Sequence, residues 1–76
     1  MRFFHTIVCH GSRRLHGIAS TGKHHATADE ALAEGREEAR RLDRADMTRD
    51  YFVRLFEVND GVGVELDPDT REVIES

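Results

Sequence analysis

The most regular hydrophobic pattern in the chain runs from Thr27 to Asp46. Small and aliphatic residues recur there at three- and four-residue steps, which is the spacing of one face of an α-helix. This stripe consists of Ala28, Leu32, Gly35, Ala39 and Leu42. Glu30 follows Thr27 by three residues, and this capping-box pattern predicts where the helix begins. We therefore expect one amphipathic helix whose narrow stripe packs closely against neighbouring strands.

Two strands are predicted before the helix by runs of β-branched and aromatic residues. We expect them at residues 3–10 and 13–20, joined by a two-residue turn at Gly11 and Ser12 that would place Val8 opposite Leu15. One side of this hairpin would carry Phe4, Thr6, Val8, Leu15, Gly17 and Ala19. The other side would carry Phe3, His5, Ile7, Cys9, His16 and Ile18. Both sides are partly hydrophobic, so the pattern leaves open which one meets the helix, and a different loop length would regroup them.

Two further strands are predicted after the helix. The first covers Tyr51 to Val58, and Asp60-Gly61, a favoured hairpin turn, leads back through residues 62–67. Pairing across this turn places one hydrophobic set on the core side: Tyr51, Val53, Leu55, Val62, Val64 and Leu66. The opposite side carries Phe52, Arg54, Phe56, Val58 and Glu65. Residues 68–70 predict another turn, after which residues 72–75 form either a short edge strand or a frayed tail.

These elements predict an α+β fold of the ββαββ type in a single domain spanning residues 1–76. The simplest topology is one antiparallel sheet in the order 2-1-3-4, with the helix on one face and a fifth short strand as an option. A single helix covers only one face of the sheet. The other face is left to water or to a partner, and we expect function there.

Composition narrows the class of protein. Cys9 is the only cysteine, so no disulfide can form within the chain, and this fits a reducing, cytoplasmic setting. No hydrophobic run is long enough to span a membrane, and the N-terminal residues lack the features of a signal peptide. We expect a cytoplasmic protein with no membrane partner.

Charge is distributed unevenly along the chain. The net charge is −4, but residues 1–25 contain no acid and all five histidines. All fifteen acidic residues lie in residues 26–76, together with seven arginines. This asymmetry predicts two faces of opposite potential. The alternative is that the first hairpin simply lacks acids.

The chain lacks the patterns that usually carry catalysis. Cys9 lies in the middle of a predicted strand, where a buried, inert thiol is more common than a reactive one. Gly61-Val62-Gly63 belongs to a hairpin turn and not to a phosphate-binding loop. The histidines show no CxxC or HxxxH spacing, so we expect surface or structural roles, with a loose metal site of His5, His16 and Cys9 as the alternative. We expect no enzyme, no cofactor and no metal.

Two groups of residues are candidates for binding a partner. On the predicted third strand, Phe52, Arg54 and Phe56 alternate on the side away from the core. Aromatic residues and arginine are enriched at the centres of protein interfaces, although both sheet faces could instead be buried by the first hairpin. On the helix, the carboxylates of Glu34, Glu37 and Glu38 are spaced so that they could imitate phosphates toward a basic groove.

Two family resemblances bear on these candidates. The run MRFFHTIV, a second strand and then ATADEALAEGREEARRL resemble the N-terminal half of HicB-type antitoxins, which implies a regulatory partner of a toxin. The size, charge and layout, with a helix followed by the hairpin YFVRLFEVNDGVGVEL, resemble small phage-encoded anti-CRISPR proteins. That second resemblance implies an inhibitor that covers the surface of a nucleoprotein.

Together these features favour a non-enzymatic protein that binds another macromolecule. Its most specific form is an anti-CRISPR-like inhibitor acting through a charged face, with a HicB-like antitoxin as the alternative and a small RNA- or metal-binding module third. We expect a protein or ribonucleoprotein partner, and a second copy of the chain is a further candidate. Direct binding to free nucleic acid is not expected, because fifteen acids oppose eleven bases.

The spacing of cysteine and histidine predicts that no structural zinc is bound. Elemental analysis of the purified protein should find far less than one zinc per chain, and a chelator should leave the melting temperature unchanged. One zinc per chain together with unfolding by the chelator would contradict this prediction.

Overall fold

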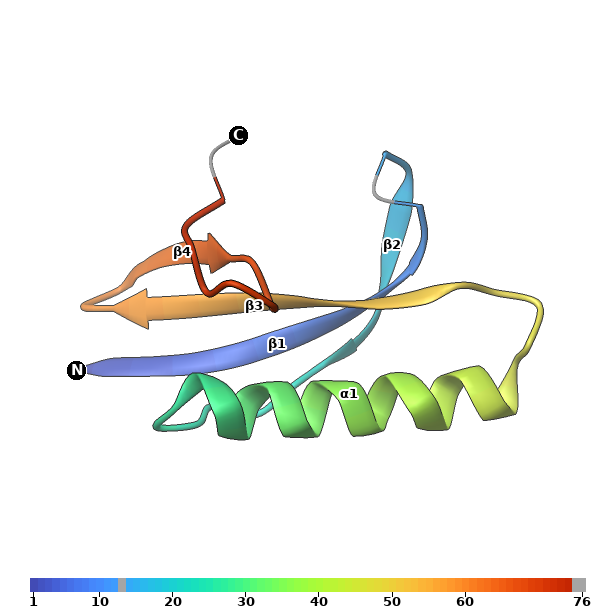
Figure 1. Cartoon of the computed structure of the whole chain (residues 1–76), viewed down its shortest axis with the longest axis horizontal. Coiled ribbons are helices and arrows are strands. Elements are labelled where there is room, and N and C mark those ends of the chain that lie inside the picture. The colour runs from blue at the N-terminus through green and yellow to red at the C-terminus, as the bar shows by residue number, and fades with distance from the viewer. Residues whose placement is uncertain (13, 75–76) are drawn as a thin grey trace.

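The computed structural model describes residues 1–12 and 14–74, which form a helix and an antiparallel sheet in two layers (Figure 1). The elements are β1 (Arg2–Gly11), β2 (His16–Thr21), α1 (Ala28–Ala45), β3 (Tyr51–Asn59) and β4 (Val62–Leu66). The strand order is β2-β1-β3-β4, and α1 packs on β1 and β3. The predicted α+β class, ββαββ order and sheet topology are therefore confirmed.

The helix lies where its caps predict. Thr27 is extended, and its Oγ1 accepts a hydrogen bond from the Glu30 N–H at 3.2 Å. At the other end the Asp46 N–H donates to the Leu42 carbonyl at 2.9 Å. The residues of α1 that are fully buried are Ala31, Leu32 and Gly35. Ala31 was not part of the predicted stripe, which is therefore wider at its N-terminal end than the spacing alone indicated.

The first hairpin differs from its prediction. β2 begins at His16, and Cys9 pairs with Ile18, so the predicted pairing of Val8 with Leu15 is wrong. The turn is longer because Ser12 binds Leu15 twice, through N–H to carbonyl and through its Oγ, which accepts from the Leu15 N–H, each at 3.1 Å. The predicted start of the second strand, residue 13, lies outside the described residues. From Cys9 to Gly11, the pairing with β2 is shifted from the predicted one by an even number of residues, so these side chains lie on the predicted sides. The register changes between Val8 and Cys9, and the predicted grouping no longer holds beyond that point.

The second hairpin has the predicted register. Asp60 and Gly61 both have positive φ, 51° and 84°, as a type I′ turn requires. Leu55 pairs with Leu66, so the predicted core side is confirmed as one face, toward α1. Only Leu55 and Leu66 are fully buried there, and Val62 is 67% exposed. The reason is that α1 lies over β1 and β3, so β4 at the edge is covered only in part.

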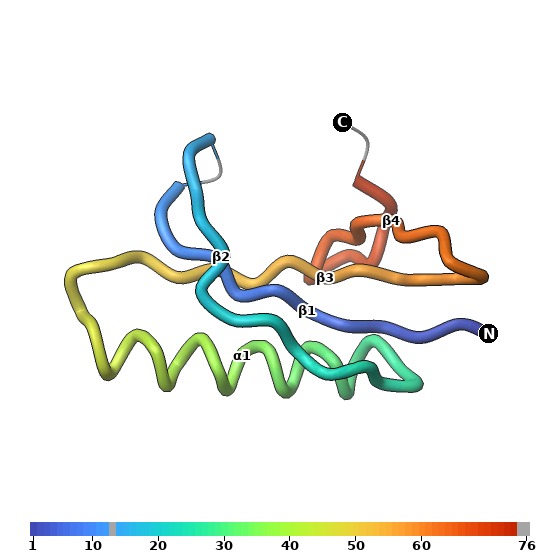
Figure 2. Tube along the Cα trace, turned by 180° about the vertical axis from the view of Figure 1, so that it is seen from behind, coloured from blue at the N-terminus to red at the C-terminus, as the bar shows by residue number. Residues whose placement is uncertain are grey.

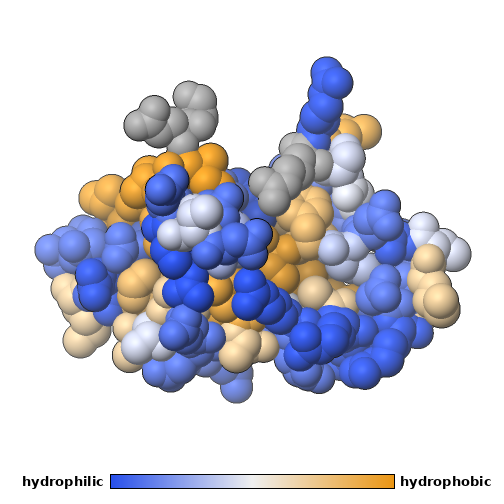
Figure 3. All heavy atoms as spheres, viewed as in Figure 1, coloured by the Kyte–Doolittle hydropathy of each residue, from blue (hydrophilic) through white to orange (hydrophobic). Residues whose placement is uncertain are grey.

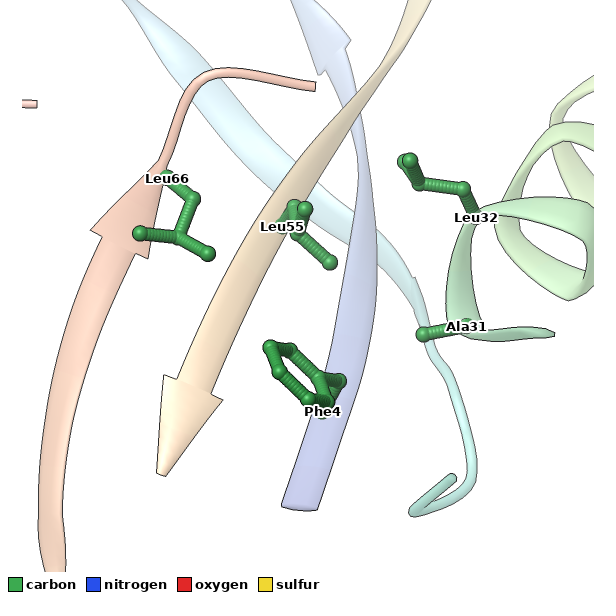
Figure 4. Close-up of a cluster of buried hydrophobic side chains, with 5 residues drawn as sticks. All are labelled: Phe4, Ala31, Leu32, Leu55 and Leu66. Carbon is green, nitrogen blue, oxygen red and sulfur yellow. The ribbon is translucent and has the colours of Figure 1, made fainter. Parts of the chain in front are cut away.

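The core lies between α1 and the sheet (Figure 4). Side chains of β1, β3 and β4 meet those of the first turns of α1 in one cluster. Its members are Phe4, Ala31, Leu32, Leu55 and Leu66. The side of the first hairpin that meets the helix is therefore the one carrying Phe4, Thr6 and Val8, all of which are buried.

The C-terminal segment, residues 67–74, lies along β4 without forming a fifth strand. Val73 forms an isolated bridge with Leu66, and the Ile74 N–H donates to the Glu65 carbonyl at 2.9 Å. The predicted edge strand is thus reduced to one bridge among the described residues, and residue 75 lies outside them. The Asp67 carboxylate accepts hydrogen bonds from the N–H groups of the next turn, at Asp69 and Thr70, as predicted for residues 68–70.

The two layers approach each other closely at Gly35. A Cβ added there would lie 2.5 Å from Thr6 Oγ1, 2.9 Å from Thr6 Cβ and 3.0 Å from Val53 Cγ1. Threonine is β-branched and stiff, and Thr6 is only 1% exposed, so its side chain has little room to withdraw. The glycine therefore permits a helix-to-sheet distance that any larger residue would increase.

We expect even Gly35→Ala to destabilise the fold, although alanine in a helix is normally about 1 kcal/mol better than glycine. Gly35→Leu should lower the free energy of unfolding by about 1–3 kcal/mol or more through overpacking. Urea unfolding measures both changes.

Ala33→Leu is the matched control, because Ala33 is exposed on the same helix and the change should stay within about 0.5 kcal/mol. A gain in stability for Gly35→Ala would show that the two layers can separate freely.

Candidate functional site

The sheet face opposite α1, here called the distal face, carries most of the aromatic and imidazole rings of the chain. Side chains alternate along a strand, so the residues between the core positions of β1 and β3 all point to this face. His24 joins them because its ring stacks on Phe3 with the ring centroids 4.0 Å apart. The distal face comprises Phe3, His5, Ile7, Cys9, His16, Ile18, His24, Phe52, Arg54, Phe56, Val58 and Glu65.

A hollow of about 160 Å³ lies on the distal face. The end of the β1–β2 hairpin and the end of the C-terminal segment rise on this side of the sheet, away from α1, in both views (Figures 1 and 2). The hollow is lined by His16, Phe52, Val53, Arg54, Glu65, Pro68 and Ile74. Its walls therefore come from both raised segments, and its floor comes from β3 and β4.

Arg54 and Glu65 form a two-point ion pair on the floor of this hollow. Arg54 Nε and Nη2 donate to the two carboxylate oxygens of Glu65 at 3.0 and 2.7 Å. The hydrogen bonds that Arg54 donates to Glu65 raise the pKa of Arg54, so the guanidinium stays charged. Arg54 Nη1 also lies 3.2 Å from His16 Nε2. Among the described residues of the distal face, Glu65 is the one carboxylate, and its charge is neutralised by Arg54.

The rings at the other end of the distal face contact one another in a continuous row. The His5 ring stacks on Phe56 with centroids 5.4 Å apart, and it lies 5.7 Å from the His24 ring. The Arg54 guanidinium lies 5.3 Å from the centre of the Phe56 ring, within the range of a cation–π contact. The row therefore joins the ion pair to the stacked pair of Phe3 and His24.

His5 is the most constrained titratable group in this row. Its Nδ1 is buried and has no hydrogen-bond partner among the described residues. Burial, followed by the nearby His24, lowers the pKa of His5 below its ordinary value of 6.5. The neutral imidazole is thus favoured, which suits its stacking between aromatic rings.

The helix carboxylates lie away from the distal face, and each of them is bonded to another group of the chain. Glu37 Oε2 accepts from Arg40 at 2.7 Å, which lowers the pKa of Glu37. Glu38 is paired with Arg41, and that hydrogen bond lowers its pKa too. Hydrophilic residues dominate the region of α1 (Figure 3), but acids and arginines alternate there.

Glu34 has a structural contact. Its Oε1 accepts from the Lys23 N–H at 2.7 Å and lies 3.2 Å from His25 Nε2. Burial raises the pKa of Glu34, but the Lys23 hydrogen bond and His25 outweigh it, so the net pKa is lowered. This carboxylate ties the chain that precedes the helix to α1.

The predicted site residues therefore fall into two separate groups. Phe52, Arg54 and Phe56 lie together on the distal face, as the alternation of β3 indicates. The three glutamates lie on α1, on the other side of the sheet. Sequence reasoning did not join His5 and His24 to the aromatic group, because it lacked the pairing of His5 with Phe56. The alternation of side chains along β1 and β3 was the one pattern in the sequence that could have placed these residues on the same face.

The structure separates the loose metal set that the sequence suggested. His16 pairs with Gly11, six residues along β1 from His5, so the two imidazoles are not diagonal neighbours. In the described parts of the chain, no group of three or more His, Cys, Asp or Glu side chains is arranged to hold a metal ion. Over the same residues, no helix combines the length and the apolar character that crossing a bilayer requires.

Comparisons with protein-family models, with curated protein sequences and with solved structures gave no match for this chain. Function is therefore inferred from the residues of the distal face and of α1 alone.

The lowered pKa of His5 predicts a pH-dependent stability. The unfolded chain takes up a proton at His5 more readily than the folded chain, so stability should be lost as pH falls through 6.5 and the loss should level off below the folded pKa. His5→Phe keeps a stacking ring without a charge, and it should flatten the pH dependence of the melting temperature between about pH 8 and 5.

His16→Phe is the matched control, since it removes an imidazole from an exposed position on the same face. Equal flattening by both variants would mean that the environment of His5 has no special role.

Proposed function

We propose that this chain is a non-enzymatic binding module that docks onto another protein through its distal face. Phe52 and Phe56 provide the apolar contact, and Arg54 provides a fixed polar contact. The observation that carries this proposal is the gathering of aromatic rings, a neutralised ion pair and a hollow on a sheet face that α1 does not cover.

The composition of the distal face supports a protein partner. The centres of protein interfaces are enriched in aromatic residues and arginine and depleted in unpaired charges. Glu65 already holds Arg54 in one orientation by two hydrogen bonds. Less side-chain entropy is therefore lost when a partner contacts the guanidinium.

The hollow gives the partner a place to anchor. A volume of about 150 Å³ is sufficient to hold a benzene-sized group. The hollow of about 160 Å³ beside Phe52, Pro68 and Ile74 can thus take one aromatic or large aliphatic side chain. Such a buried anchor surrounded by weaker contacts is the usual arrangement of binding hot spots.

The helix carboxylates are less suited to bind a basic partner. Glu37 and Glu38 are already paired with Arg40 and Arg41, so a basic groove would have to displace these arginines. An anti-CRISPR-like inhibitor remains the specific form of the proposal, acting by covering a surface of a nucleoprotein. Steric cover by the distal face replaces phosphate imitation as its mechanism.

Free nucleic acid is a poor ligand for the distal face. Binding to a phosphate backbone depends on several lysine or arginine contacts. Among the residues that define the distal face, all of which the structure describes, Arg54 is the one such residue, and it is bound to Glu65. The rings could stack on bases, but the chain has a net charge of −4.

The proposal is tested by capturing a partner from lysate of the source organism and measuring its affinity for defined variants. The double variant Phe52→Ala/Phe56→Ala should weaken binding by about 2 kcal/mol or more, which is about 30-fold, because apolar burial is lost. The affinity should change little as salt is raised. Met47→Ala is the control, because Met47 is 84% exposed and belongs to neither site.

Charge reversal on the helix separates the two surfaces. Glu37→Lys/Glu38→Lys should leave the affinity nearly unchanged, and Glu34 is kept because it ties Lys23 to α1. Loss of binding in the helix variant, with steep salt dependence, would favour the acidic surface instead. Micromolar binding to free RNA or DNA at physiological salt would contradict both forms.

A further inference from the structure

The hollow on the distal face is lined by both hydrophobic and charged residues. Phe52, Pro68 and Ile74 contribute the hydrophobic part of the lining, and Arg54 and Glu65 contribute an ion pair. The His16 ring meets the Phe52 ring edge to face, with the centroids 5.5 Å apart and the ring planes at 77°. A ligand in the hollow therefore contacts an apolar surface and an ion pair at the same time.

The ion pair makes the hollow unfavourable for charged ligands. Arg54 Nη2 and Glu65 Oε1 are 2.7 Å apart, so any charge placed beside one of them is repelled by the other. Both oxygens of Glu65 already accept from Arg54. A ligand carboxylate would have to displace Glu65 and leave it partly buried without the arginine, which costs free energy. The hollow therefore suits an uncharged ligand.

Arg54 still has a hydrogen bond to offer such a ligand. A guanidinium donates through Nε and through two N–H groups on each Nη. Glu65 engages Nε and Nη2, and because arginine only donates, Nη1 donates to His16 Nε2 at 3.2 Å. Within the described residues, one N–H thus remains on each Nη, and the Cys9 thiol is close enough to accept one of them. At least one N–H is left for a ligand that carries an acceptor.

Size and hydrogen bonding together select one kind of side chain. The volume of about 160 Å³ matches a single six-membered ring and is too small for an indole. A phenyl or aliphatic side chain would fill this space but would shield the remaining Arg54 N–H from water without replacing that hydrogen bond. A phenol has the same ring together with an oxygen that can accept from Arg54.

We propose that the hollow binds a tyrosine side chain of the docked protein. Its ring packs against Phe52, Pro68 and Ile74, and its hydroxyl oxygen accepts a hydrogen bond from Arg54. This inference rests on the proposed function, because it names the residue that anchors the partner on the distal face. It adds the chemistry by which the anchor is chosen, namely an uncharged ring with a hydroxyl group.

Two uncharged amino-acid amides test this inference on the full chain. N-acetyl-tyrosine amide and N-acetyl-phenylalanine amide differ only in the hydroxyl group, so the ratio of their affinities measures its contact. In NMR titrations the tyrosine amide should bind about tenfold more tightly or better, because a polar site rejects the analogue that lacks the hydroxyl. The largest shifts should occur at the backbone N–H groups of Phe52, Arg54 and Ile74, which line the hollow.

Three variants assign the preference to its cause. Arg54→Met removes the donor and should bring the two affinities within about twofold of each other. Arg49→Met is the matched control, because Arg49 also pairs with a carboxylate, Asp46 at 3.4 Å, but does not line the hollow, and it should keep the preference. Phe52→Ala should weaken both amides alike, because both rings lose the same apolar contact. Circular dichroism checks that each variant is folded, and the wild-type ratio decides the inference even if Arg54→Met fails to fold.

Failure of this inference can be told apart from failure of the proposed function. Equal affinities of the two amides for the wild-type chain, or shifts confined to residues away from the hollow, would overturn the tyrosine anchor. The distal face could then still dock a partner, provided that Phe52→Ala/Phe56→Ala weakens the binding of that partner. If the double variant binds the partner as tightly as the wild type does, the proposed function is wrong and the anchor falls with it.

Discussion

The contact between Gly35 of α1 and Thr6 of β1 sets the distance between the two layers, and the rest of the fold follows from that distance. A close approach allows short side chains to fill the space, which is why Ala31 can be fully buried beside Leu32. It also limits how much hydrophobic surface the core can hold. Most of the stability of so small a domain must then come from a few well-packed residues on β1, β3 and the first half of the helix.

A two-layer fold with one helix leaves half of its sheet without a hydrophobic cover. On this face, polar side chains pair with one another and the rings stack. Arg54 is satisfied by Glu65, and the His5 ring, whose pKa is lowered by burial, lies between those of Phe56 and His24. The face is consequently apolar enough to lose water to a partner and polar enough to remain hydrated without one.

Features that depend on neighbours in the sequence could be predicted well. The Thr27 cap, the Asp60-Gly61 turn and the alternation that brings Phe52, Arg54 and Phe56 to one side are all local, and each was found where the pattern indicated.

Features that depend on distant pairing could not be predicted in the same way. The turn at residues 12–15 is lengthened by the side chain of Ser12, and this moved Leu15 away from Val8. The contact of His5 with Phe56 requires the register of β1 against β3, which no local pattern contains. The pairing of the helix carboxylates with arginines one turn away is a choice among rotamers, and the spacing of charges alone does not decide it.

The C-terminal segment connects three parts of the molecule that are otherwise separate. Arg71 donates to Asp29 at the start of α1, the Ile74 N–H bonds to β4, and Ile74 lines the hollow on the distal face. This short segment is therefore attached to the helix, to β4 and to the hollow at the same time. When it opens, the β4 edge, the first turn of the helix and one wall of the hollow lose their contacts together. Local opening of the eight residues 67–74 would therefore be enough to convert a defined docking surface into an exposed strand edge.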